Sequence, residues 1–361
     1  MDSIEDNGRR FDLAKVVEKR NEEQRKLQVT GGSTYILSLP KEWVTQNQLK
    51  KGSLMVLSEE DDGSLSITSS MLEKKEKKDD AFIRVSSNDN PDAVMRKAIS
   101  AYLIGYNILH VRAQGQQSLA VGLRNYLKHF ARNYLVGAEI VIDSPTDLTL
   151  QILLNYSELS VQSALRRMSI IASSMHKEAV GCLESLDYSA AKAVVETDRE
   201  VNRFSLYIVR LLKLAVSNAR IVREIGLDNS RECLGYRLIV KSVERTADHA
   251  TKIAENMLFL RDPINPELLE RIEKLSSLAI SMFESAVEAL FGHDYNLAES
   301  VIEKLAQIHK LEEEAVLSSH NVQIDQIPNL RLMIESIRRT AEYASDISEV
   351  VLNLNAESVL G

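Results

Sequence analysis

The pattern of apolar and polar positions changes near residue 155. Before that point, short runs alternate between apolar and polar residues and end at glycine, proline or charged clusters, which is typical of strands. After it, apolar residues recur every three or four positions over long stretches, which predicts amphipathic helices. The charged run at 71–80 is rich in Lys, Glu and Asp and is predicted to be a linker. The pattern therefore predicts a mainly α-helical protein preceded by smaller β-containing regions.

Residues 25–70 are predicted to form a small β-rich domain. Strand-like runs lie on either side of Gly31-Gly32, which is a turn signal, and SLMVLS and SLSIT lie on either side of EEDDG. Pro40 is expected at the first position of a short helix between the two hairpins. Residues 1–24 form a charged extension without the apolar segment of a signal peptide.

Residues 81–154 are predicted to form a small α/β unit. The strand-like runs FIRV, ILHV and AEIVID alternate with helical stretches around 91–105 and 116–135. The glycines of this segment lack the GxGxxG and P-loop spacings, so nucleotide binding is not supported.

An internal repeat organises the remainder of the chain. Residues 168–196 align without a gap with 275–303, and each copy contains an Asp-Tyr pair that predicts a turn between two helices. The segment ERTADHATKIAE at 244–255 has an echo, RRTAEYASDISE, at 338–349. We therefore expect tandem three-helix bundles, the first over 155–262 and the second over 263–361.

Charge, cysteine content and the lack of catalytic motifs narrow the kinds of function that this protein can have. The formal net charge is −8, but residues 25–51 carry a local charge of +4, with only Glu42 opposing Arg25, Lys26, Lys41, Lys50 and Lys51. The two cysteines form no framework or CxxC pair, which fits a reducing compartment. No nucleophile, base and orienting group follow a catalytic spacing, so no enzyme is expected. The most apolar run is broken by Arg210 and Lys213, so we expect a soluble, cytoplasmic protein without membrane insertion.

Two polar residues lie inside an apolar stripe in the helix that follows the first Asp-Tyr pair. With Asp198 at 0°, Val194 falls at about −40°, Val195 at about 60° and Asn202 at about 40°. On the next helix, Glu244 and Asp248 border the apolar stripe. Because an unpartnered buried carboxylate costs several kcal/mol, Asp198 requires a cation, a metal or a hydrogen-bond network.

Three explanations compete for Asp198, Asn202, Glu244 and Asp248. The first is a buried polar network or an ion pair with Arg237 or Arg245. The second is an oxygen-rich site for a divalent or iron-type metal ion. A ferritin-type di-iron site is excluded, because the Glu-x-x-His motif is absent and His249 directly follows Asp248. The first two explanations remain open.

These helices resemble the PhoU family of phosphate uptake regulators. The resemblance rests on the tandem repeat, ETDREVN on one helix and VERTADHATKIAE on the next, and it covers roughly 160–355. It implies a metal site at Asp198, Asn202, Glu244 and Asp248. The second copy departs from the motif, with Leu305 in place of Asp198 and Arg338 in place of Glu244. A reduced second metal site would use His309, Glu313, Glu342 and Asp346.

The front segment resembles the SpoVT/AbrB swapped-hairpin domain, in an arrangement of archaeal type. The resemblance rests on LPKEW after the second strand, the KKG turn and the hairpin closing on Asp-Asp-Gly, although Ser53 replaces a commonly acidic residue. It implies an intertwined homodimer that presents basic residues to DNA, for which the candidates are Arg25, Lys26, Lys41, Lys50 and Lys51.

Together the two resemblances predict a dimeric, cytoplasmic regulator of phosphate uptake that binds DNA through its front domain and metal through its helical bundle. They imply partners among phosphate ABC transporter components or signalling kinases. The alternative is a metal- or phosphate-binding adaptor that acts only by protein contacts, its front domain serving dimerisation alone.

Overall fold

The computed structural model describes residues 23–59, 63–69, 80–86, 88–115, 118–155, 158–216, 218–319 and 323–360. The chain divides into two compact units, 1–77 and 78–361. Residues 1–22 of the predicted N-terminal extension (1–24) and most of the predicted linker lie outside the described residues. The last linker residue, Asp80, already belongs to a strand, so the prediction for that position was wrong.

The first unit contains two antiparallel hairpins and one short helix. Gly31 and Gly32, with φ of 63° and 85°, close the first hairpin, in which Thr30 lies opposite Thr34. Pro40 is the N-cap of the helix and not, as was predicted, its first residue. Its carbonyl accepts the first helical hydrogen bond, from Val44 N at 3.0 Å. The elements are β1 (Gln28–Thr30), β2 (Thr34–Ile36), α1 (Lys41–Gln46), β3 (Met55–Glu59) and β4 (Leu65–Ser69).

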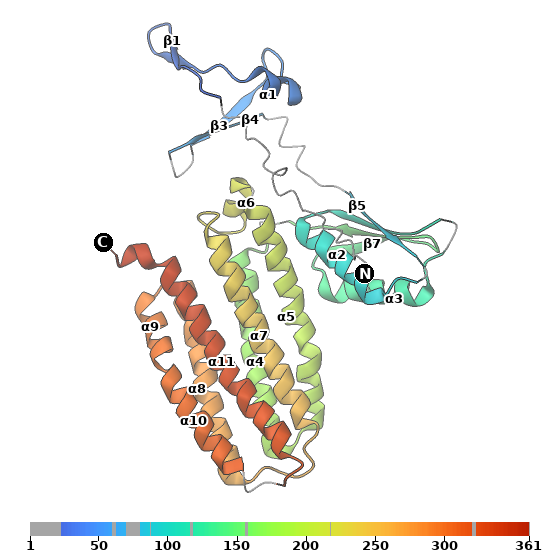
Figure 1. Cartoon of the computed structure of the whole chain (residues 1–361), viewed down its shortest axis with the longest axis vertical. Helices are drawn as coiled ribbons and strands as arrows, with labels where there is room; N and C mark the ends of the chain where they lie inside the picture. The colour runs from blue at the N-terminus through green and yellow to red at the C-terminus, as the bar shows by residue number, and fades with distance from the viewer. Residues whose placement is uncertain are drawn as a thin grey trace, which may run out of the picture. The chain divides into compact units, whose positions relative to one another are not determined.

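The second unit begins with an α/β layer. A four-stranded sheet has the order β5-β6-β8-β7, in which β5 and β6 are parallel and β8 is antiparallel to both neighbours. The crossovers through α2 and α3 run in the same direction along the sheet, so right-handed connections place both helices on one face (Figure 1). The elements are β5 (Asp80–Val85), α2 (Pro91–Ile104), β6 (Ile108–Ala113), α3 (Val121–Tyr134), β7 (Ala138–Asp143) and β8 (Asp147–Ile152).

Strand β8 was not predicted, although its sequence alternates as a strand should. Leu148, Leu150 and Ile152 are buried in the α/β core. Because β8 lies between β6 and β7, it joins two strands that would otherwise share no hydrogen bonds.

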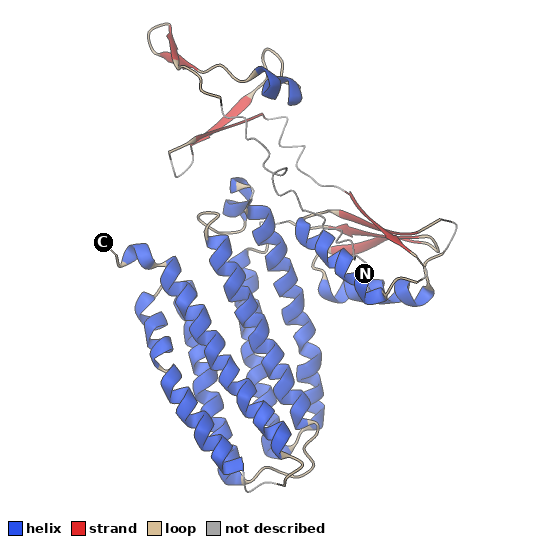
Figure 2. Ribbon diagram, in the orientation of Figure 1, coloured by secondary structure: helices blue, strands red, loops and turns tan. Residues whose placement is uncertain are grey.

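Long helices make up the rest of the second unit (Figure 2). The three-helix repeats are present, with two departures: the short α6 lies in the connection of the first repeat, and the middle helix of the second repeat is broken at Lys304. The helices are α4 (Val161–Ser185), α5 (Tyr188–Ala215), α6 (Ala219–Glu224), α7 (Glu232–Met257), α8 (Pro266–Gly292), α9 (Tyr295–Glu303), α10 (Leu305–Ser318) and α11 (Ile327–Leu354), followed by a 3-10 turn at Ala356–Ser358.

The predicted Asp-Tyr turns are helix starts with side-chain caps. Asp187 accepts hydrogen bonds from the backbone N–H groups of Ser189 and Ala190, and Asp294 accepts one from Leu297. The residue before each aspartate, Leu186 or His293, ends the preceding helix with φ near the left-handed region, at 50° and 53°. The repeat therefore preserves the complete geometry of the helix–turn–helix corner.

The two repeats share one apolar core. Helices α4 and α8 pack together, as do α7 and α11. His249 on α7 meets Tyr343 on α11 with ring centroids 5.6 Å apart. These two residues occupy equivalent positions in their copies, and a contact between equivalent positions is what a local two-fold axis produces.

Helix α8 has the composition of a candidate membrane span among the described helices. An 18-residue window within it reaches a mean hydropathy of 1.2, yet half of that window is buried inside the bundle. The core helices of soluble proteins have the same length and composition, so this feature is weak evidence for a membrane.

Arg210 joins the α/β layer to the bundle. Its side chain is fully buried on α5, and its guanidinium donates to the carbonyls of Tyr102, Gly105 and Tyr106 and to Asn107 Oδ1 at 3.1 Å. The carbonyls belong to the C-terminal end of α2, where the helix dipole is negative. The sequence showed Arg210 only as an interruption of an apolar run.

We expect Arg210→Ala to lower the free energy of unfolding by about 3 kcal/mol, because it leaves the end of α2 buried without its donors. Lys213→Ala on the exposed side of α5 is the matched control and should change the stability by less than about 0.5 kcal/mol. Urea denaturation followed by helical circular dichroism measures both. Equal midpoints for the two variants would show that Arg210 does not hold the layers together.

Candidate functional site

The candidate site lies between α5 and α7 of the first repeat. Asp198 and Asn202 are half-buried on α5, among the buried residues Val194, Val201 and Ser205. Asn202 Nδ2 donates to Asp198 Oδ2 at 2.6 Å, as expected for residues one helical turn apart. The other carboxylate oxygen, Asp198 Oδ1, is buried and has no hydrogen-bond partner.

Glu244 and Asp248 are half-buried on the neighbouring helix, α7. Glu244 accepts a hydrogen bond from Ser205 Oγ at 3.1 Å and pairs with Lys241 Nζ at 2.9 Å. Glu244 is thus partly satisfied by groups of the protein. Asp248 has no ion pair within the described part of the chain.

The pKa values of Asp198 and Asp248 are raised, which indicates that negative charges lie close together. Burial, followed by repulsion from Asp248 and Glu244, raises the pKa of Asp198 to about 6, and Glu255 adds to the repulsion. Burial and the charge of Glu244 also raise the pKa of Asp248. The three carboxyl groups therefore sense one another across the α5–α7 contact, and their repulsion is only partly offset by Lys241.

Neither arginine considered for an ion pair fills that role. Arg237 makes no ion pair in the described ranges, and Arg245 lies with its guanidinium 5.8 Å from the ring centre of Tyr343. A hydrogen-bond network exists, but it leaves Asp198 Oδ1 without a donor. An unpartnered buried acceptor beside a second and third carboxylate suits a cation.

The side chains do not form a finished metal centre. No group of three or more His, Cys, Asp and Glu side chains close enough to hold an ion occurs among the residues that the structure describes. The donor types suit a hard or borderline cation, whereas their present spacing does not amount to a coordination shell. The metal assignment of Asp198, Asn202, Glu244 and Asp248 stays a prediction.

The second repeat supplies its own positive charge at the equivalent place. Arg338, which replaces Glu244, pairs with Glu342 and with Glu312, the latter with Nε 2.8 Å from Oε1. Arg339 pairs with Glu342 as well. Leu305, which replaces Asp198, packs against the apolar core.

The four residues of the predicted second metal site are mostly exposed. His309, Glu313 and Asp346 are exposed. Glu342 forms ion pairs with Arg338 and Arg339. His309 Nδ1 lies 3.9 Å from Glu312, a residue that was not predicted. The prediction of a reduced second site remains untested, but its central carboxylate already has two cationic partners.

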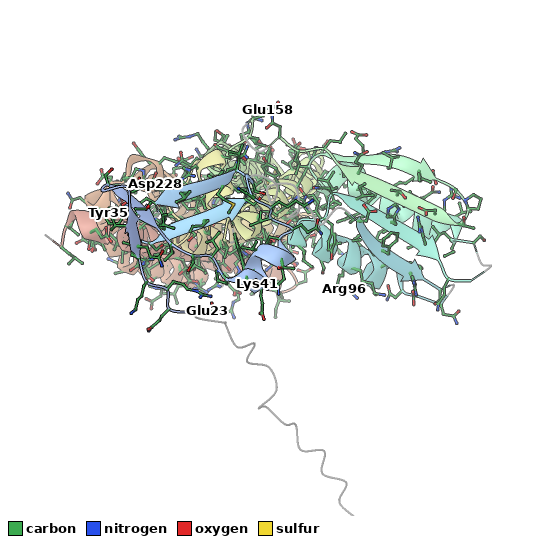
Figure 3. The ribbon with its side chains drawn as sticks, turned by 90° about the horizontal axis from the view of Figure 1, so that it is seen from above. Glu23, Tyr35, Lys41, Arg96, Glu158 and Asp228 are labelled. Atoms are coloured by element: carbon green, nitrogen blue, oxygen red, sulfur yellow. The ribbon has the colours of Figure 1, made fainter. Side chains whose placement is uncertain are left out.

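The five predicted DNA-contacting residues are all exposed in the first unit. Arg25 pairs with Glu23, whereas the four lysines make no ion pair with described residues. Figure 3 marks Lys41 on α1 and Tyr35 on the first hairpin.

Comparison with known proteins identifies the class of both regions. The model of the PhoU domain matches residues 165–257 and 272–351, one match for each helix triplet. The model described as antidote-toxin recognition MazE, a bacterial antitoxin, matches residues 28–78. The tandem bundle therefore consists of two PhoU domains, and a MazE/AbrB-like domain precedes them in the chain.

Individual relatives are distant. The chain is 22% identical, over 47% of its length and 79% of the relative's, to a phosphate-specific transport system accessory protein PhoU homolog of Borreliella burgdorferi. The phosphate transport system regulatory protein PhoU of Streptococcus pneumoniae is similar with a TM-score of 0.48 and 19% identity, over 56% of this chain and 96% of that one. PhoU of Pseudomonas aeruginosa gives a TM-score of 0.48 and 21% identity, over 55% and 96%.

We expect Asp198→Asn to stabilise the metal-free protein near pH 7 by about 1 kcal/mol, a figure reduced for solvent screening. The pKa of Asp198 is raised in the fold, so the folded state favours the neutral carboxyl. Ionised Asp198 therefore destabilises the parent protein only slightly near pH 4, and this destabilisation is fully present above pH about 6. Unfolding in urea with a chelator, at pH 4.5 and 7, measures the effect.

Glu196→Gln, an exposed change on the same helix, is the control and should show no such pH dependence. An Asp198→Asn variant that is no more stable than the parent at pH 7 would refute the crowding of charge around this carboxyl.

Proposed function

We propose that the protein is a non-enzymatic, cytoplasmic regulator of phosphate uptake. The observation that carries the proposal is the match of PhoU domains to both helix triplets, preceded by a MazE-like domain with a local positive charge. The Borreliella relative, an accessory protein of a phosphate-specific transport system, supports a role in phosphate uptake. The partners would be components of a phosphate ABC transporter or a signalling kinase.

The first unit supports a homodimer. Its two hairpins leave large apolar side chains in water, among them Tyr35 at 68% exposure and Leu57 at 60%. Isolated two-stranded hairpins are marginally stable, and this unit buries no apolar side chain among its described residues. A second copy that pairs with these hairpins would cover the apolar surface, as swapped-hairpin domains do.

The same unit would contact DNA. Lys26, Lys41, Lys50 and Lys51 are exposed and lack acidic partners in the part of the unit that the structure describes. Free lysines of this kind neutralise phosphates and release counterions, which gives affinity that falls steeply with salt. The helical repeats, which carry the acidic surplus, would serve as the sensor.

The first helical repeat would bind a divalent or iron-type metal ion through Asp198, Asn202, Glu244 and Asp248. Support comes from the unpartnered Asp198 Oδ1 and from the mutual repulsion of the carboxylates, which a cation would remove. A bound cation would neutralise the charge between α5 and α7 and thereby stabilise their contact.

The DNA claim is tested with the full chain and a promoter fragment from its phosphate-transport genes. We expect a mobility shift at low salt that is lost when Arg25, Lys26, Lys41, Lys50 and Lys51 are all changed to Gln. The slope of log K against log salt should fall by about 0.9 for each phosphate contact removed.

The matched control changes a second set of exposed basic residues, outside the first unit, to Gln: Lys192, Arg203, Lys213, Lys274 and Lys310. It should bind DNA as the parent does. No binding of the parent at low salt would leave the protein as an adaptor whose front domain only dimerises.

A further inference from the structure

A cavity of about 630 Å³ lies between the α/β layer and the first helical repeat. One wall comes from α2 and α3, and the other comes from α5 and α7. Both walls belong to the second unit and are joined by Arg210, so the cavity is part of one folded body. Its volume is in the range of pockets that hold small molecules.

Part of the lining is apolar and aromatic. Phe130 and Tyr134 of α3 stack with ring centroids 5.1 Å apart, and Ile99 of α2 lies on the same wall. Leu206 and Val209 of α5 face them from the bundle. Such a surface accepts a flat, apolar body by stacking and by burial of apolar area.

Another part of the lining is polar, and its three charged residues, Arg237, Lys241 and Glu244, carry a net positive charge. Lys241 is paired with Glu244 at 2.9 Å, whereas Arg237 has no acidic partner among the described residues. Asn202 and Ser205 add hydrogen-bonding groups. A guanidinium without a carboxylate, at the edge of an apolar cavity, is suited to a single anionic group, because charge-assisted hydrogen bonds to Arg are strong and directional.

We propose that this cavity binds a small aromatic anion, with its ring against Phe130 and Tyr134 and its anionic group on Arg237. The cavity shares Asn202 and Glu244 with the proposed cation site. The proposed contacts to Phe130, Tyr134 and Arg237 use neither of these two residues, and the proposal requires neither DNA binding nor cation binding. Since it touches α2, α3, α5 and α7 together, an occupant would bridge the α/β layer and the first repeat.

The probe for the test is 8-anilinonaphthalene-1-sulfonate, an aromatic anion whose fluorescence rises in an apolar site. We expect the full chain to bind it saturably. Arg237→Ala should weaken binding about tenfold, which corresponds to about 1.4 kcal/mol. The uncharged N-phenyl-1-naphthylamine should bind more weakly than the anion and equally to the parent and to Arg237→Ala.

Two filling variants locate the bound probe. Leu206→Trp fills the cavity from α5, and Ile99→Trp fills it from α2, so a folding defect in one does not prevent the test. Each should abolish saturable binding while retaining the helical circular dichroism of the parent. Leu234→Trp and Arg231→Ala are the controls, because both residues are exposed on or next to α7 and neither lines the cavity.

Unchanged binding in both filling variants would place the probe elsewhere, for example on the exposed strands of the first unit, and would overturn the proposal. Equal affinity for the charged and uncharged probes would overturn the assignment of an anion.

Discussion

The buried guanidinium of Arg210 determines how the second unit is assembled. It reaches from the C-terminal part of α5 to the carbonyls at the end of α2, where its positive charge offsets the dipole of α2, and its N–H groups donate to those carbonyls. Gly105 ends α2 with φ of 109°, and a Cβ at that position would lie 2.5 Å from Leu214 of α5. The close contact of the two layers thus depends on one arginine and one glycine. Helices of the same two layers line the cavity.

The two repeats differ in how they balance the negative charge between their second and third helices. Each repeat places acidic side chains between its second and third helices. In the second repeat, Arg338 and Arg339 neutralise Glu342 from within the protein. In the first, Lys241 pairs with Glu244, and Asp198 retains an oxygen without a donor. Under the proposed function, a bound cation would supply the missing positive charge in the first repeat, whereas the second repeat carries that charge in its own sequence.

Much of the fold was predictable because its signals are local. The helical period, the Asp-Tyr turns and the Gly-Gly hairpin depend on a few neighbouring residues, and each was found where the sequence predicted it. Strand β8 was missed because a six-residue alternation is a weak signal, and its central place in the sheet follows from pairing with distant strands. Similarly, the break at Lys304 has no strong local signal.

The candidate site shows the same limit. Helical angles placed Asp198 and Asn202 in an apolar stripe, and both are half-buried. The partners could not be derived in that way, because they depend on how α5 packs against α7. The sequence suggested Arg237 or Arg245 as the cation, but the structure pairs Lys241 with Glu244. Arg210 likewise revealed its role only when the end of α2 was placed beside it.

The most direct test introduces into the first repeat the positive charge that the second repeat carries at the equivalent position. Glu244→Arg introduces the residue found at the equivalent position, Arg338. The parent and the variant are loaded in turn with iron(II), zinc and magnesium, dialysed and analysed for metal content. The parent should retain one of these cations, and the variant should retain none while melting at a higher temperature than the parent in the presence of a chelator. Equal metal content in the two proteins would contradict a cation site in the first repeat.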